Sequence, residues 1–195
     1  MSINVRISKI LRTFSVNSLL QSYKENEILA EEYPLDQNYP LLENFIVKEV
    51  SLGGEYLSPY IFALSYGKHP NESIRFFLGL TDSEDIIEQQ YKYECDVCNG
   101  INIIKNEESL INFQCRHCGF EDHLSSSEHL SEVKLIFNIN NSLLKATKEN
   151  LKDNPLSFES QFSAAIKRGI NQEVSLKSAE ELIYKEGKPI GKKSV

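Results

Sequence analysis

The chain has 195 residues, of which 41% are hydrophobic and 25% charged, and this composition excludes a disordered or fibrous protein. Its formal net charge is −7, and residues 34 to 125 hold six Lys and Arg against fifteen Asp and Glu. Phosphate backbones bind clustered basic side chains, so the segment from Cys95 to Glu121, with two basic and four acidic residues, is a poor candidate for binding nucleic acid. The start MSINVRISKI lacks a signal-peptide pattern, and no eighteen-residue apolar run occurs. We therefore expect a cytoplasmic, reducing environment and no membrane contact.

The N-terminal region is expected to be helical. Apolar residues at helical spacing predict helices within residues 3 to 33, and the Tyr-Pro pairs ending at Pro34 and Pro40 make 34 to 40 a connector. Pro40 then opens a helix to about Val50, which Gly53 ends.

The next helix has clear start and stop signals. Ser58 is the expected N-cap, Pro59 the first helical residue and Gly67 the residue just past the end. The segment between them is apolar nearly all round, so it is buried either in the core or against a partner.

Residues 70 to 93 have the pattern of two helices. Residues 72 to 78 predict one helix, Gly79 a turn, and Thr81 with Glu84 a capping box that opens a second helix through Tyr91. The pattern fits either a winged-helix element or a plain helical hairpin, and residues 74 to 78 also fit a β-strand. In a winged helix the second helix would face the DNA, and the phosphates would repel its four carboxylates. A winged helix here would therefore bind protein rather than DNA. The carboxylates are Asp82, Glu84, Asp85 and Glu88.

All four cysteines lie in the next stretch, as two Cys-x2-Cys pairs separated by sixteen residues. Two such pairs can direct four sulfurs at one ion, so we expect one zinc ion on Cys95, Cys98, Cys115 and Cys118. A pair of redox motifs, an iron centre and disulfides are the alternatives. Four thiolates close the coordination shell, so the zinc is expected to be structural, with His117 and His123 outside it.

The residues around the cysteines predict tight turns and a hairpin. Asn99-Gly100 and Gly119 tolerate the positive φ that such turns require. Between the pairs, 101–104 and 110–113 are expected to form two strands joined by a polar turn. This segment resembles the zinc-ribbon (rubredoxin-like) group over about residues 93 to 124. The resemblance implies a structural metal with four ligands and no particular activity, because zinc ribbons occur in many functional contexts.

After the cysteines, the chain again alternates between strand and helix signals. Residues 133 to 139 predict a strand, with a continuous helix from 127 to 151 as the alternative. A short helix is expected over 158 to 168, and Ser178 with Glu181 is expected to cap a last helix that ends at Gly187.

We therefore expect an α+β fold: a mainly helical protein with an inserted four-cysteine zinc ribbon. The three expected parts are a helical region over 1–92, the ribbon over 93–124, and a C-terminal α(+β) region over 125–195.

The leading functional hypothesis is a non-catalytic accessory or adaptor subunit that docks on a larger protein. By base rate it belongs to a bacterial multi-component complex, anti-phage systems included. The first alternative is a nucleic-acid-binding regulator that uses the basic C-terminal third, namely Lys167, Arg168, Lys185, Lys192 and Lys193. Nucleic acid could also be reached through the partner. The second alternative is an enzyme with a structural zinc, although no linear catalytic motif is present.

Overall fold

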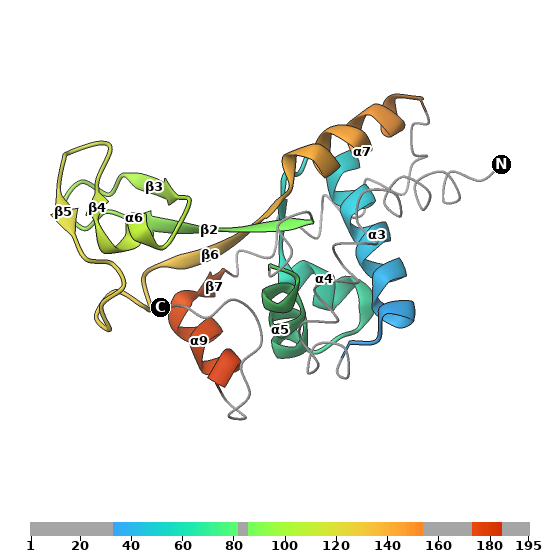
Figure 1. The fold of residues 1–195 in the computed structure, drawn as a ribbon, viewed down its shortest axis with the longest axis horizontal. Coiled ribbons are helices and arrows are strands. Elements are labelled where there is room, and N and C mark those ends of the chain that lie inside the picture. The colour runs from blue at the N-terminus through green and yellow to red at the C-terminus, as the bar shows by residue number, and fades with distance from the viewer. Residues whose placement is uncertain (1–32, 82–85, 154–172, 185–195) are drawn as a thin grey trace.

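The computed structural model describes residues 33–81, 86–153 and 173–184. Within these ranges the protein is α+β, with helices packed beside an antiparallel sheet and the cysteine-rich segment at one end of the molecule (Figure 1). None of the helices in these ranges combines the length and the apolar character needed to cross a membrane.

The helical part contains α3 (Leu35–Ser51), α4 (Pro59–Tyr66) and α5 (Pro70–Leu80). Its core is built from phenylalanine rings in edge-to-face contact: Phe62 lies 5.3 Å from Phe45 and 5.4 Å from Phe77, measured between ring centroids. Phe77 in turn lies 5.5 Å from Phe137 of the sheet. Such contacts add to the free energy gained by burying apolar area, so this cluster joins the helices to the sheet.

The central sheet has the strand order β1-β6-β2-β3, and β7 also pairs with β6. Its strands are β1 (Tyr56–Leu57), β2 (Ile87–Glu94), β3 (Ile101–Ile104), β6 (Lys134–Ile139) and β7 (Val174–Ser175). Every pairing is antiparallel, and β2 pairs with β6 from Ile87↔Ile139 to Lys92↔Lys134. These two strands run side by side from the helices toward the cysteine-rich segment (Figure 1).

Residues 95 to 133 are inserted between these two neighbouring strands. They include α6 (Glu108–Ile111) and a two-stranded sheet of β4 (Phe113–Gln114) and β5 (Glu121–Asp122). We call residues 93 to 124 the cysteine module. Its core contains Tyr93, whose ring contacts Phe113 at 5.2 Å between centroids.

Two expectations for the helical part are confirmed. Helix α4 begins and ends as predicted: the Ser58 hydroxyl accepts a hydrogen bond from the Ile61 amide, and Gly67 has φ +63°. The helix through Val50 also forms, followed by Gly53 at φ +78°. The apolar surface of α4 is divided, because Phe62 is buried and Leu64 is 58% exposed.

Other expectations for the first half are wrong. Residues 35 to 40 belong to α3, with Pro40 inside the helix, because a proline removes a single helix hydrogen bond that an otherwise well-packed helix can lose. Helix α5 continues through Gly79, and Thr81 closes it by donating a hydrogen bond to the Leu78 carbonyl. The strand alternative for 74–78 is therefore also wrong.

The predicted second helix through Tyr91 is wrong as well, since residues 87 to 94 form strand β2. Ile87 and Tyr91 are buried on the sheet, and pairing with a strand far along the sequence outweighs the local helix signal. A winged-helix arrangement with a helix reaching Tyr91 is excluded.

In the C-terminal part, the strand prediction for 133–139 is confirmed by β6, and the continuous helix from 127 to 151 is wrong. Helix α7 (Asn141–Asp153) follows, with the Asn140 side chain accepting a hydrogen bond from the Ser142 amide. Helix α9 (Leu176–Tyr184) begins earlier than predicted, because Ser175 rather than Ser178 supplies the cap. The helices expected over 3–33 and 158–168 lie outside the described residues.

Candidate metal centre

The four cysteine sulfurs converge on one point, as the spacing predicted. One ligand atom from each cysteine lies within 4.8 Å of the others. The Sγ atoms of Cys95 and Cys118 are 3.8 Å apart, and those of Cys98 and Cys115 are 3.7 Å apart. Metal–sulfur bonds of about 2.3 Å in a tetrahedron place the sulfurs about 3.8 Å apart. The thiols are free, so the cluster can bind a metal ion.

Each Cys-x2-Cys pair forms a turn at the tip of its own hairpin. The first turn joins β2 to β3, and the second joins β4 to β5. The amide of Cys95 donates to the Gly100 carbonyl at 3.0 Å, and the amide of Cys115 donates to the Phe120 carbonyl at 2.7 Å. The expected positive φ occurs at Asn99 (56°) and at Gly119 (76°). Two similar turns therefore face each other across the sulfur cluster.

The strands predicted between the pairs need correction. Residues 101 to 104 are a strand, but it pairs with β2 and not with 110–113. Residues 108 to 111 form α6, and Phe113 belongs to β4, where its side chain is 3% exposed. Two hairpins replace the single hairpin expected between the turns, because each turn connects a pair of strands: the strand before it pairs with the strand after it.

Asn102 connects the two turns and was not singled out from the sequence. Its side chain is buried; its Nδ2 donates to the Gly100 carbonyl at 2.8 Å and lies 3.5 Å from the Cys115 sulfur. Its Oδ1 accepts a hydrogen bond from the Arg116 amide at 3.0 Å. The signal was a single polar residue within the apolar segment Ile101–Ile104, since a buried amide requires polar partners.

The thiols of the cluster differ in acidity. Burial alone would raise the pKa of Cys115, but the amides of Cys118 and His117 and the Asn102 side chain outweigh this effect and lower it to about 6. At Cys98, a backbone hydrogen bond at Gly100 favours the thiolate, but desolvation and the three neighbouring thiols raise its pKa to about 12. Four adjacent thiolates repel each other, so all four ionise together only around a cation.

The two nearby histidines bond locally, as expected, and are not part of the sulfur cluster. His117 Nε2 is 3.2 Å from the Ile101 carbonyl oxygen, and its ring lies against Gly100. A Cβ atom at Gly100 would come within 2.4 Å of the His117 ring, so this close approach of the two turns requires glycine. His123 Nε2 is 2.5 Å from the Ser125 hydroxyl oxygen.

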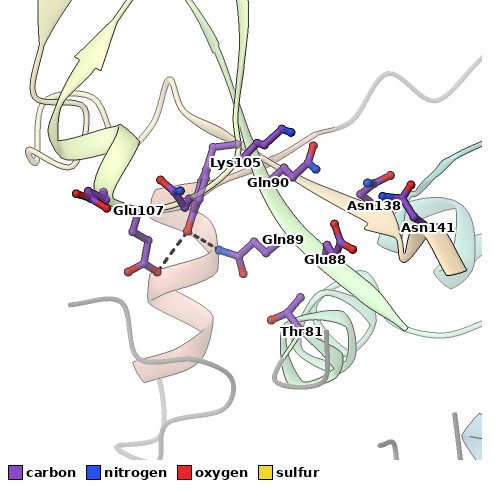
Figure 2. A pocket seen from close by; sticks show the side chains of 11 residues that line it. Thr81, Glu88, Gln89, Gln90, Lys105, Glu107, Asn138 and Asn141 are labelled. Carbon is purple, nitrogen blue, oxygen red and sulfur yellow. Dashed lines mark hydrogen bonds between the residues drawn. The ribbon is translucent and has the colours of Figure 1, made fainter. Parts of the chain in front are cut away.

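A separate cavity of about 710 Å³ lies between β2, the start of α7 and the loop before α6 (Figure 2). Its lining is mostly polar: Thr81, Glu88, Gln89, Gln90, Tyr91, Lys105, Asn106, Glu107, Glu108, Asn138 and Asn141. The Tyr91 hydroxyl accepts a hydrogen bond from Gln89 at 2.9 Å and donates one to Glu107 at 3.3 Å; dashed lines mark both bonds in Figure 2. Burial, and next the Glu107 charge, raise the pKa of Tyr91, so its hydroxyl stays protonated.

Two histidines that the sequence analysis considered do not meet at a common site in the described residues. His69 caps α5 through Nδ1, which accepts from the Asn71 amide, and neither His69 nor His123 lines the polar cavity. The basic residues of the nucleic-acid alternative, Lys167, Arg168, Lys185, Lys192 and Lys193, lie outside the described residues.

No protein-family model matches the chain, and comparisons with curated proteins and with solved structures find no significant similarity.

Proposed function

We propose that the cysteine module is a zinc ribbon, that it holds one structural zinc ion, and that it serves as the docking element of an accessory subunit in a larger protein assembly. Zinc is favoured among tetrahedral metals because four thiolates suit it and because it requires no redox partner. Four protein ligands leave no coordination position for water or substrate, which favours a structural rather than a catalytic metal.

The observation that carries the docking proposal is the exposure of apolar side chains on the module. In the described part of the chain, three of the five exposed large hydrophobic residues belong to it: Val97 (63%), Ile101 (55%) and Ile111 (41%). Val97 lies between two metal ligands, so its backbone is held by the metal. An apolar side chain on a rigid turn loses little conformational entropy on binding, which favours a protein partner.

The charge around these residues defines the chemistry of the partner. From Cys95 to Glu121 the module carries Lys105 and Arg116 against Asp96, Glu107, Glu108 and Glu121. An acidic surface repels phosphate backbones and attracts basic protein surfaces. We therefore expect a partner protein with an apolar patch bordered by Lys or Arg side chains.

The test is co-expression with the products of neighbouring genes, followed by size-exclusion chromatography and metal analysis of each peak. We expect one stable complex with zinc in it, lost in the double variant Val97→Ser, Ile101→Thr. Leu64→Ser is the matched control, because Leu64 is equally exposed but lies on α4 of the helical part.

A complex that still forms with the double variant would contradict the docking proposal. The proposal would also be contradicted if this protein elutes as a separate peak after co-expression with each neighbouring gene product. A shift of the elution volume seen only with nucleic acid at low salt would favour the regulator alternative instead. Metal other than zinc in the purified protein would contradict the identity of the ion without affecting the docking test.

A further inference from the structure

A second cluster of metal-ligating side chains lies beside the first cysteine turn. Asp96, His129 and Glu132 each offer one ligand atom, and these three atoms lie within 4.8 Å of one another. Ligands bound to one ion at about 2.1 Å are separated by about 3 to 4.2 Å. The three side chains therefore need only small rotations to share an ion. None of them is a ligand of the cysteine cluster.

The surrounding contacts hold these side chains in place. Tyr93, which is fully buried, donates its hydroxyl hydrogen to Asp96 Oδ2 at 2.9 Å, and its ring lies edge-to-face with the His129 ring. His129 and Glu132 lie on one helical turn, in which the Glu132 amide donates to the His129 carbonyl at 2.9 Å. Spacing of i, i+3 places both side chains on the same side of that turn.

The two nitrogens of His129 have different partners. Nε2 lies 3.3 Å from Asp122 Oδ2, and Nδ1 lies 3.0 Å from Glu132 Oε2. A carboxylate on one ring nitrogen fixes the tautomer of a metal-binding histidine and leaves the lone pair of the other nitrogen toward the metal. In that arrangement Nδ1 and Glu132 are both acceptors, and a cation between them removes their repulsion.

The charge balance also favours a cation. Asp96, Asp122 and Glu132 bring three carboxylates to one imidazole, and within the described ranges none of them forms an ion pair with a lysine or arginine. Even a protonated His129 leaves an excess of two negative charges, which a divalent ion would neutralise.

We propose that Asp96, His129 and Glu132 form a second divalent-metal site of mixed carboxylate and imidazole ligands, with Asp122 as a positioning residue. The side chains of Asp96 and Glu132 are exposed, so the site exchanges its ion more readily than the thiolate cluster. Because the ion exchanges readily, the occupancy of the site follows the free metal concentration. The ion joins the first cysteine turn to the segment that leads back into β6.

The test is equilibrium dialysis of the full chain against micromolar Zn²⁺, with the metal content per chain measured by mass spectrometry. We expect the wild type to hold one ion more than Glu132→Gln. The matched control Glu128→Gln removes an exposed carboxylate next to His129 and should leave the content unchanged. Asp122→Asn should lower the affinity of the second site for its ion about 10- to 100-fold.

Substitution with Co²⁺ separates the two sites, because only the thiolate cluster gives sulfur-to-cobalt charge-transfer absorption. Glu132→Gln should lower total cobalt without changing that absorption, which also verifies that the module is folded. Equal metal contents for wild type and Glu132→Gln would overturn the proposal, and so would an equal loss in Glu128→Gln. If the cobalt-substituted wild type shows no sulfur-to-cobalt absorption, the zinc-ribbon proposal is contradicted instead.

Discussion

The helical part and the cysteine module are stabilised by different interactions. The helical part buries four phenylalanine rings that contact one another, and one of them, Phe77, also contacts Phe137 of the sheet. In the module the elements are short, with two-residue strands and a four-residue helix, and the connections converge on four sulfurs. A segment of this size buries little apolar area, so the proposed metal would supply the stability that its core lacks. The difference predicts that the two regions respond to different perturbations.

Removing the metal should have the largest effect, confined to the module. Structural zinc contributes about 10 to 16 kcal/mol to comparable small folds, so chelation or Cys115→Ser should unfold residues 95 to 122. Hydrogen exchange should show loss of amide protection there, while α3, α4 and α5 keep theirs. Unchanged amide protection in the metal-free module would contradict the idea that metal stabilises the module while the aromatic core stabilises the helical part.

Truncating the aromatic core should have the converse effect. Phe77 is fully buried and contacts Phe62, Phe76 and Phe137, so Phe77→Ala should lower the free energy of unfolding by about 3 to 5 kcal/mol. Denaturant unfolding followed by circular dichroism measures this loss. The metal affinity of the variant should stay near that of the wild type; a large drop would show that the two regions fold as one unit.

A methyl group at the contact between the two cysteine turns should have a smaller effect. Gly100→Ala places a Cβ against the His117 ring and should destabilise the module by about 1 to 3 kcal/mol. Competition with a chelator should show weaker metal binding. The double variant Gly100→Ala, His117→Ala should recover most of the metal affinity. If it does not, the destabilisation by Gly100→Ala comes from the backbone and not from the contact with the His117 ring.

The smallest expected effect is on the helical part alone. Ser58→Ala removes the cap of α4, whose hydrogen bond to Ile61 is long at 3.4 Å, so the loss of stability should be about 0.5 to 1 kcal/mol. Thermal unfolding detects this as a shift of Tm with unchanged metal content. Ser58→Thr keeps the hydroxyl and should retain most of the stability.

What the sequence predicted correctly was encoded locally. The Ser58, Pro59 and Gly67 signals define α4 within neighbouring residues, and the cysteine spacing identifies the sulfur cluster without knowledge of the fold. Strand β2 was misassigned because its partner, β6, lies about fifty residues away in sequence, and capping signals near Thr81 carry no information about that partner.

The candidate sites follow the same rule. The four sulfur ligands come as two short motifs and are visible in the sequence, as are the glycine and asparagine of their turns. The cluster of Asp96, Asp122, His129 and Glu132 is assembled from three separate segments, and only the fold brings them together. Asn102 stands out in the sequence as one polar residue within an apolar segment, but the groups that its side chain bonds are identified only by the fold.

The insertion of the module between β2 and β6 also affects the order of folding. Lys92 and Lys134 pair across the two strands, yet the whole module separates them along the chain. Bringing these ends together in an unfolded chain costs closure entropy, which grows with the number of flexible residues between them. With the proposed metal bound, the folded module would bring the two strands close together, and their pairing would become nearly local. We therefore expect the supply of the proposed metal during synthesis to change the rate at which the central sheet forms, as well as the stability of the module.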